Sequence, residues 1–249
     1  MRREVAAAGA RGLVVGLSGG VDSAVVARLC QIAMPDGVVA MLMPCHSDPL
    51  DEQHARLAAE HFRLPLVRAD LSVAYDQLVG ALQAALASVP GAAARQSDAD
   101  PRSRLPLANA KPRLRMASLY FVANRLNYLV AGTGNRSELA IGYFTKYGDG
   151  GADLLPLGRM LKSEVVAFAR LLGVPSPIVE KPPSAGLWLG QTDEGEMGFR
   201  YAELEAYLTE GPEAVAPAVA MKIERLVRAS EHKRALPRMP DPDRRPEAL

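Results

Sequence analysis

Short apolar runs alternate along this chain with longer stretches in which apolar residues recur at helical spacing. Such runs are typical of strands buried on both faces of a parallel sheet, and the longer stretches of the helices that cover it. The pattern therefore predicts an α/β fold with a doubly wound, Rossmann-like parallel sheet and helices on both faces. The predicted strands span residues 12–17, 37–43, 64–69 and 128–131, and the predicted helices 23–34, 51–62, 73–89, 113–126, 161–172, 199–208 and 212–229.

Two internal stretches and the C-terminal end depart from this alternation. Residues 90–106 and 182–195 are rich in Gly, Pro and small or polar residues, which is typical of mobile loops. Residues 237–249 combine several prolines with many charges, and we expect a loose tail there. Nothing else in the pattern marks a domain boundary, so we expect a single domain over residues 1–249.

The overall charge disfavours several classes of protein. Lys and Arg number 29 against 28 for Asp and Glu, so the net charge is +1 and lacks the basic excess usual in nucleic-acid binders. No apolar run approaches the roughly 18 residues that a membrane helix needs. The basic start is not followed by the apolar segment and cleavage site of a signal peptide. We therefore expect a cytoplasmic protein with neither a nucleic acid nor a membrane as partner.

The cysteines also exclude some kinds of site. The chain has only Cys30 and Cys45, and neither belongs to a Cys-x-x-Cys motif. A disulfide framework, a structural zinc site and an iron–sulfur cluster are therefore not expected.

Residues 18–23, Ser-Gly-Gly-Val-Asp-Ser, follow the first predicted strand, at the sheet edge where doubly wound folds bind ligands. Two glycines allow close approach of an anion, and the hydroxyls of Ser18 and Ser23 can join the helix N–H groups around phosphate oxygens. A carboxylate beside phosphate is repulsive unless a cation lies between them, so Asp22 indicates Mg²⁺. The alternative is an ordinary glycine-rich turn in which Asp22 caps the helix.

Two later segments are predicted to reach the same edge of the sheet. Glu138 ends a Gly-rich stretch after the strand at 128–131 and could supply a second magnesium carboxylate, although acids are common at any helix start. Residues 142–153 combine glycines, a lysine, two aspartates and aromatics, which favours a ligand-enclosing loop over a merely structural one. Lys162 could reach phosphates, although exposed helix lysines are common.

These motifs resemble those of a known enzyme superfamily. Residues 18–23 resemble the pyrophosphate loop of the N-type ATP pyrophosphatases, which cleave ATP to AMP and pyrophosphate while adenylating a substrate oxygen. The later segments resemble the ammonia-dependent NAD synthetase family within it, through Gly-Thr-(x)₄-Glu at 132–138 and Gly-(aromatic)₂-Thr-Lys-(aromatic)-Gly-Asp-Gly-(x)₂-Asp at 142–153. Further matches are Asn-x-x-x-Arg-x-Arg-Met at 109–116, Pro-Ser-Ala-Gly-Leu-Trp at 183–188, Gln-Thr-Asp-Glu at 191–194 and Glu-His-Lys-Arg at 231–234. The resemblance runs from about Leu13 to Pro237 and implies an adenine nucleotide alpha hydrolase-like fold.

The resemblance implies roles for individual residues, matched position by position. Asp22, Glu138 and Lys162 would be catalytic, and Asp22 and Glu138 would bind Mg²⁺. The residues implied for ATP are Gly16, Leu17, Ser18, Gly19, Gly20, Val21, Asp22, Ser23, Thr133, Lys162 and Ser184, the last standing where threonine is usual. The residues implied for deamido-NAD are Arg113, Lys146, Asp153, His232 and Lys233.

The implied reaction amidates deamido-NAD in two steps. The nicotinate carboxylate attacks the α-phosphorus of ATP and releases pyrophosphate, and ammonia then displaces AMP to give NAD. Mg²⁺ and loop N–H groups would stabilise the charge on pyrophosphate, and no nucleophilic side chain is needed. Closure of residues 90–106 or 182–195 would shield the adenylate from water. The chain has no room for the additional domain of glutamine-using relatives, so we expect ammonia or a separate glutaminase subunit as nitrogen source.

The resemblance also implies a homodimer with the substrate site near its interface, although few residues precede the first strand, where the family has a longer helix. Pro112 replaces the small residue usual before Arg113, and because proline fits only the first turn of a helix, the helix start is expected to shift.

Three other functions stay open on the sequence. Amidation of nicotinate mononucleotide would use the same chemistry. A tRNA thiolase is disfavoured because paired cysteines and a basic surface are missing. A non-catalytic nucleotide-binding protein is disfavoured because Asp22, Glu138 and Lys162 are all present.

Overall fold

The computed structural model describes residues 1–89, 101–184, 186, 191–237 and 239, and its centre is one parallel sheet. Four strands lie in the order β3-β2-β1-β4, and every neighbouring pair is parallel. They are β1 (Gly12–Gly16), β2 (Val38–Leu42), β3 (Leu66–Arg68) and β4 (Tyr128–Ala131). The chain builds outward from β1 through β2 to β3 and then returns to place β4 on the other side of β1. The predicted doubly wound α/β fold is therefore confirmed.

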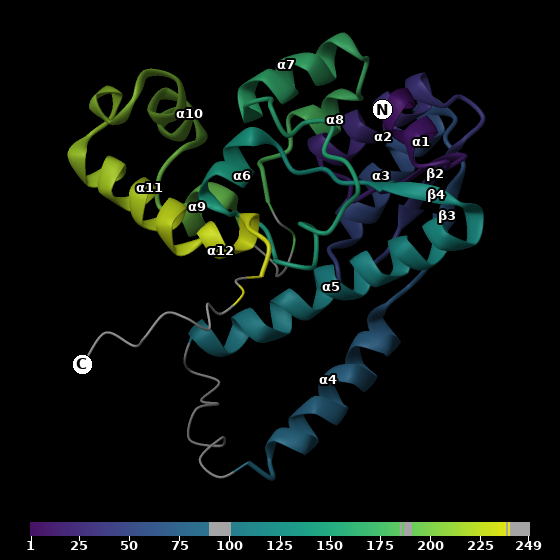
Figure 1. Cartoon of the computed structure of the whole chain (residues 1–249), viewed down its shortest axis with the longest axis horizontal. Coiled ribbons are helices and arrows are strands. Elements are labelled where there is room, and N and C mark those ends of the chain that lie inside the picture. Colours follow the sequence, from purple (N-terminus) through teal and green to yellow (C-terminus); the bar gives the residue numbers. More distant parts are fainter. Residues whose placement is uncertain (90–100, 185, 187–190, 238, 240–249) are drawn as a thin grey trace.

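The helices of the described residues cover the sheet and extend beyond it (Figure 1). The first part of the chain has α1 (Arg2–Ala7), α2 (Val21–Ala33), α3 (Pro49–Phe62), α4 (Ser72–Leu86), α5 (Pro101–Leu126) and α6 (Arg136–Ile141). The second part has α7 (Lys162–Leu171), α8 (Ser176–Val179), α9 (Asp193–Met197), α10 (Tyr201–Glu210), α11 (Pro217–Ala229) and α12 (Glu231–Arg234), with a 3-10 turn at Pro212–Ala214. None of these helices is long and apolar enough to cross a membrane.

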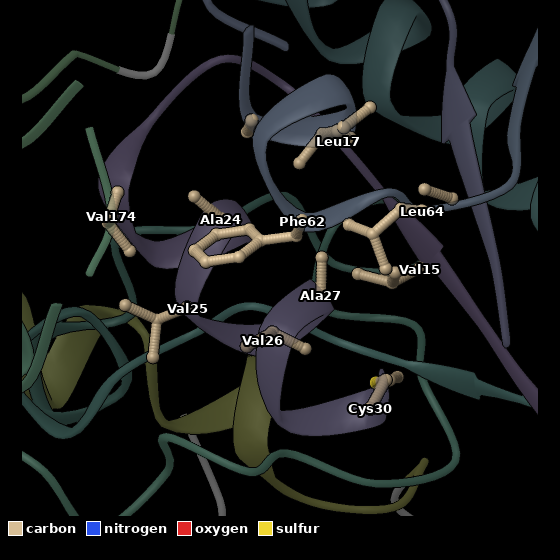
Figure 2. Close-up of a cluster of buried hydrophobic side chains, with 14 of the residues drawn as sticks. Val15, Leu17, Ala24, Val25, Val26, Ala27, Cys30, Phe62, Leu64 and Val174 are labelled. Carbon is tan, nitrogen blue, oxygen red and sulfur yellow. The ribbon is translucent and has the colours of Figure 1, made fainter. Parts of the chain in front are cut away.

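The two faces of the sheet carry separate parts of the core, because side chains alternate along a strand. Leu13 and Val15 of β1 face α2, α3 and α7, where a cluster of buried aliphatic side chains packs around Phe62 (Figure 2). Val14 points the other way and packs with Val130 and Ala123, the latter on α5. This burial on both faces is the reason that the central strand β1 has a continuous apolar run.

A smaller core joins the C-terminal helices to the edge of the domain. Leu204 of α10 and Ile223 of α11 are fully buried and pack with Ile141 of α6 and Phe199. In Figure 1, α10 and α11 lie beside α6, away from the sheet. This packing places α9 and α12 near the loop that leaves α6.

The N-terminal end of α5 is the main correction to the predicted elements. The helix begins at Pro101 and not near residue 113, so residues 101–106 are helical where a loop was expected. Pro112 lies inside the helix and not in its first turn. An interior proline costs a helix about 3 kcal/mol, but Pro112 is buried against the loop at Gly148, and this packing offsets part of the cost.

Some of the predicted loops and tail fall outside the described residues. These are residues 90–100, 185, 187–190, 238 and 240–249. The other predicted strands and helices are confirmed, with shifts at their ends. The pattern missed the short helices, including α1, whose Arg2 guanidinium donates to the carbonyls of Ile32 and Ala33 at the end of α2.

Candidate functional site

A cavity of about 470 Å³ opens at the carboxyl ends of the strands, beside the point where the order of the strands reverses between β1 and β4. Ligands bind at this switch point in doubly wound folds. The cavity is lined by the loop after β1, the ends of β2 and β4, one side of α5, and the segments around 142–151 and 181–186. All the residues predicted to bind ATP line this cavity except Gly19.

The loop after β1 is braced by its two serines. The Ser18 backbone N–H donates to the Ser23 hydroxyl at 3.1 Å, and that hydroxyl donates to the Gly20 carbonyl at 2.8 Å. Gly20 is the N-cap of α2, and no side chain caps this helix end. The first N–H groups of α2 therefore stay available to an anion. Asp22 is not the helix cap, which removes the structural alternative for this residue.

Gly19 has a conformation that requires glycine. Its φ is +82°, in the left-handed region. A Cβ atom at this position would collide with the carbonyl oxygen of Asp51, in the first turn of α3. The loop therefore packs directly against α3, and glycine permits this close approach.

Asp22, Glu138 and Lys162 meet at one side of the cavity, although they come from three different helices. The Lys162 ammonium forms a short ion pair with Asp22 Oδ2 and lies 3.8 Å from Glu138 Oε1. The side chain of Lys162 is only 7% exposed. Lys162 thus lies between two carboxylates that were predicted, from distant motifs, to face one another.

Asn135 holds both carboxylates and was not recognised from the sequence. Its side-chain N–H donates to Asp22 Oδ1 at 2.9 Å, and its backbone N–H donates to Glu138 Oε2 at 3.2 Å. In return its side-chain oxygen accepts from the Glu138 backbone N–H, which forms a capping box on α6. Asn135 is completely buried, so it is a rigid link between the loops after β1 and β4.

Burial dominates the electrostatics of this centre. Loss of solvent, reinforced by the Asp22 charge, raises the pKa of Glu138 to about 8 against the opposing effect of Lys162. Burial alone would lower the pKa of Lys162, but Asp22 and Glu138 outweigh it and raise that pKa. Burial also raises the pKa of Asp193, which lines the same cavity. The carboxyl groups of Asp22 and Glu138 flank one ammonium here, with Asp193 as a further acid nearby, and such an acidic region favours a further cation.

The residues implied for deamido-NAD gather around the loop at 142–153 and α12. Lys233 lines the cavity, where its ammonium donates to the carbonyls of Gly142 at 2.8 Å and Phe144 at 2.7 Å. Lys146 donates to the His232 carbonyl at 2.5 Å, and Arg113 to the Lys146 carbonyl at 3.4 Å.

Four of these residues do not line the cavity, namely Arg113, Lys146, Asp153 and His232. The carboxylate of Asp153 accepts hydrogen bonds from the Val130 backbone at 2.7 Å and the Tyr120 hydroxyl at 3.1 Å. The structure thus gives Asp153 a role within the chain, and its role toward a ligand stays a prediction.

Two further cavity-lining groups were missed from the sequence. Lys181 and Asp51 form a close ion pair between the segment before Ser184 and the start of α3. Arg115 donates to the Met43 carbonyl and to the Ser47 hydroxyl, both at 3.0 Å. The motif at 109–116, which contains Arg115, could have indicated this residue. For Asp51 the sequence showed only that an acid stands in the first turn of a predicted helix.

Three comparisons place these features among known proteins. A family model described as NAD synthase matches residues 1–237. The NH(3)-dependent NAD(+) synthetase of Carboxydothermus hydrogenoformans is 51% identical to this chain over 240 residues, which cover 96% of this chain and 93% of the relative.

Two solved structures share the fold over nearly the whole chain. The NMN synthetase of Francisella tularensis aligns with a TM-score of 0.86 and 35% identity, over 96% of this chain and 93% of the other. The NH3-dependent NAD synthetase of Campylobacter jejuni aligns with a TM-score of 0.74 and 27% identity, with the same coverage of both chains.

Proposed function

The chain belongs to the NAD synthase family, and from this premise we propose that it amidates deamido-NAD to NAD with ATP and ammonia, as a ligase that releases AMP and pyrophosphate. The observation that carries the proposal is the meeting of Asp22, Glu138 and Lys162 beside an open helix N-terminus in one cavity. A non-catalytic nucleotide-binding protein would not need this buried charged centre.

The nicotinate mononucleotide is the second candidate acceptor. The NMN synthetase of Francisella tularensis aligns with a higher TM-score, 0.86, than the Campylobacter jejuni NAD synthetase, 0.74. The two activities differ only in whether the acceptor carries a second nucleotide. Both acceptors carry the same nicotinate carboxylate, so the chemistry at Asp22, Glu138 and Lys162 is the same for both.

Mg²⁺ fits the pair formed by Asp22 and Glu138. The described residues hold no cluster of three or more His, Cys, Asp or Glu side chains suited to a metal. Mg²⁺ does not need one, because it commonly uses one or two carboxylates together with substrate phosphates. Both carboxylates already face one cation, the ammonium of Lys162. When bound here, Mg²⁺ would supply positive charge to the phosphates of ATP.

The residues of the chain explain how the first step would proceed. The open N–H groups of α2 would hold phosphate oxygens in a fixed orientation, and the hydroxyls of Ser18 and Ser23, which are hydrogen-bonded to each other, brace the loop around them. The acceptor carboxylate forms a bond to the α-phosphorus while the bond to pyrophosphate breaks. Lys162 adds a fixed positive charge where negative charge develops on the leaving group.

The second step replaces AMP by nitrogen. Ammonia forms a C–N bond to the activated carbonyl carbon, and the C–O bond to AMP breaks. Pro183 and Ser184, on one side of the cavity, and Thr133, at the end of β4, would enclose the adenylate and limit attack by water.

One assay set tests the activity and separates the acceptors. The protein is incubated with ATP, Mg²⁺ and ammonium, with either deamido-NAD or nicotinate mononucleotide, and AMP and both amides are quantified by chromatography. NAD formed from deamido-NAD supports the proposal. Amide formed only from nicotinate mononucleotide would show that the mononucleotide, and not deamido-NAD, is the acceptor. AMP formation without either amide would contradict both proposed acceptors. A parallel reaction with glutamine in place of ammonium tests the need for a separate glutaminase subunit.

Magnesium binding should depend on pH through Glu138. The pKa of Glu138 is raised from 4.5 to about 8 in the folded protein. Without metal, the free energy of unfolding therefore falls as the pH rises from about 4.5 to about 8, because only the unfolded chain ionises this carboxyl freely in that range. Mg²⁺ must displace the proton that Glu138 carries below about pH 8. We therefore expect Mg²⁺ to raise the melting temperature more at about pH 8.5 than at about pH 6.5.

Differential scanning fluorimetry measures this effect with and without Mg²⁺. The Glu138→Gln variant serves as control, because its side chain does not titrate and its response to Mg²⁺ should be small at both pH values. An equal response of the unaltered protein at both pH values would contradict the assignment.

We expect a homodimer formed through α4 and α5. None of the residues of α4 is buried, and Figure 1 shows this helix extending away from the sheet. Leu82 on α4 is 53% exposed, and Phe121 on α5 is 68% exposed. A second copy of the chain would cover such apolar surface. It would also approach α5, which carries Arg113, a predicted substrate residue outside the cavity of the single chain.

The pair of substitutions Leu82→Glu and Phe121→Glu tests the dimer. We expect the unaltered protein to elute as a dimer and the double variant as a monomer, because burying two carboxylates in an apolar interface is costly. Light scattering after gel filtration measures both masses. The matched control is Leu171→Glu, which changes an 83% exposed leucine on α7 and should leave a dimer. A monomeric unaltered protein would contradict the proposal.

A further inference from the structure

Asp193, the first residue of α9, carries a buried oxygen that accepts no hydrogen bond from the part of the chain that the structure describes. The residue is 3% exposed and lines the cavity. Its Oδ2 accepts a hydrogen bond from the Tyr201 hydroxyl at 2.9 Å. Its Oδ1 is buried and accepts no hydrogen bond within 3.5 Å from the described residues; the nearby Tyr143 hydroxyl, which helps to lower the pKa of this carboxyl, donates to Glu196 at 2.8 Å. An unsatisfied buried carboxylate oxygen is costly, so its retention beside a cavity points to a ligand that completes it.

The other carboxylates along the cavity are engaged within the chain. They accept hydrogen bonds or form ion pairs with neighbouring residues, and they are Asp22, Asp51, Glu52, Glu138, Asp149 and Glu196. Among the described residues that line the cavity, Asp193 is the acid with a buried oxygen left without a donor. It is therefore the acid that a small donor in the cavity could still reach.

The surroundings of Asp193 favour a positively charged donor. Desolvation raises the pKa of Asp193, and a cation is the ligand that most relieves a desolvated carboxylate. The ring of Tyr201 adds an aromatic face, over which the Lys162 ammonium already lies at 5.6 Å from the centroid. Lys162 itself is held by Asp22. The free oxygen thus fits a second, small cation with N–H donors.

The proposed function supplies such a cation, since ammonia in neutral water is mostly ammonium. We propose that Asp193 binds the ammonium ion that provides the amide nitrogen, with its free Oδ1 accepting an N–H hydrogen bond and its charge offsetting the loss of water around the ion. This inference rests on the proposed function and assigns its nitrogen substrate a binding residue.

The chemistry of the second step balances with this assignment. Ammonium has no free electron pair, so it must lose one proton before it attacks. That proton passes to the carboxylate oxygen that holds the ion. The freed electron pair forms the C–N bond to the adenylate carbonyl carbon, the C–O bond to AMP breaks, and the amide nitrogen loses a second proton to solvent. A residue in this position affects the nitrogen substrate and leaves adenylation unchanged.

The test compares Asp193→Asn with the unaltered full-length protein, using two nitrogen nucleophiles. Asparagine keeps the shape and can still accept from Tyr201 through its amide oxygen, but it has no charge. Hydroxylamine is largely neutral near neutral pH and needs no anionic partner, and its product is the hydroxamate. We expect Asp193→Asn to raise the KM for ammonium about tenfold to 100-fold. The kcat/KM for hydroxylamine should change less than about threefold.

Glu194→Gln is the matched control. It removes one negative charge from the next position of the same short helix, but Glu194 is exposed and does not line the cavity. We expect the KM for ammonium of this variant to equal that of the unaltered protein. An equal rise in this variant would show that loss of charge anywhere on α9 is enough, and would overturn the assignment to Asp193.

Exchange of labelled pyrophosphate into ATP, with deamido-NAD or the mononucleotide and no amine, measures adenylation alone. No exchange in the unaltered protein with either acceptor would refute the proposed function. If Asp193→Asn exchanges pyrophosphate normally and only its KM for ammonium rises, the inference stands. If the variant exchanges normally but its kcat/KM values for ammonium and hydroxylamine are both unchanged, or both fall by the same factor, the inference fails while the proposed function survives.

Discussion

Replacing Asp22 with asparagine is expected to lower the rate of AMP formation by about 100-fold to 1,000-fold, the loss typical of a group that stabilises transition-state charge. Asp22 shares the Lys162 ammonium with Glu138 and belongs to residues 18–23, the segment that we propose binds phosphate. The neutral amide can neither hold Mg²⁺ as strongly nor keep Lys162 in place. Steady-state assays with ATP, Mg²⁺, ammonium and deamido-NAD measure the effect.

The same substitution is also expected to cost stability. Lys162, with a side chain only 7% exposed, loses its closest partner, and breaking a buried ion pair costs about 3 kcal/mol in the free energy of unfolding. A second replacement, Lys162→Met in the Asp22→Asn background, removes the unpaired charge and should recover much of that stability without restoring activity. Circular dichroism on heating measures this.

The control for charge removal is Asp36→Asn, at an exposed position between α2 and β2. It should match the unaltered protein in both activity and melting temperature. Near-normal turnover in Asp22→Asn would contradict the role assigned to the carboxylate. A double variant with full activity would contradict the role of the whole centre.

Replacing Gly19 with alanine is expected to produce the second large effect, a loss of ATP binding. The φ of +82° costs an L-residue roughly 1–2 kcal/mol, and the new Cβ would also collide with the Asp51 carbonyl oxygen. The loop must therefore move away from α3, and a displacement near 1 Å can cost about 100-fold in rate. Calorimetry with ATP and steady-state kinetics measure the two consequences.

Gly173→Ala separates the two causes. Gly173 has a φ of +76°, but a Cβ atom there meets nothing within 4 Å. This variant therefore carries the backbone strain without the collision, and it should lose some stability and keep its affinity for ATP. If Gly19→Ala binds ATP as well as Gly173→Ala does, the close packing of the loop on α3 is not needed for phosphate binding.

The sheet and most of its covering helices could be predicted because each depends on local periodicity. Leu13, Val14 and Val15 are all buried, which produces the unbroken apolar run of a central strand. The N-terminal half of α5 could not be predicted in this way. Its interior prolines, Pro106 and Pro112, are local signals against helix, and at Pro112 this signal is offset by contacts with a loop distant in sequence.

The candidate site was predictable to a similar extent. The residue types and the strand–loop–helix order of two motifs predicted that Asp22 and Glu138 lie at the same edge of the sheet, and in the structure both carboxylates approach the Lys162 ammonium; their role toward Mg²⁺ stays a prediction. The roles of Arg113, Lys146, Asp153 and His232 stay predictions, because these residues do not line the cavity of the single chain.

The sequence by itself determined the class of fold, and it indicated the segment that we propose binds phosphate and the residues of the charged centre, because these depend on spacing along the chain and on side-chain chemistry. Only the tertiary structure decided that Asn135 connects the two carboxylates and that Asp193 keeps one buried oxygen to which none of the described residues donates. Burial and hydrogen bonding depend on which groups meet in space, and these groups come from segments that no local pattern relates. The physical reason for the difference is therefore the range of the interactions: periodicity is local, whereas desolvation and pairing are not.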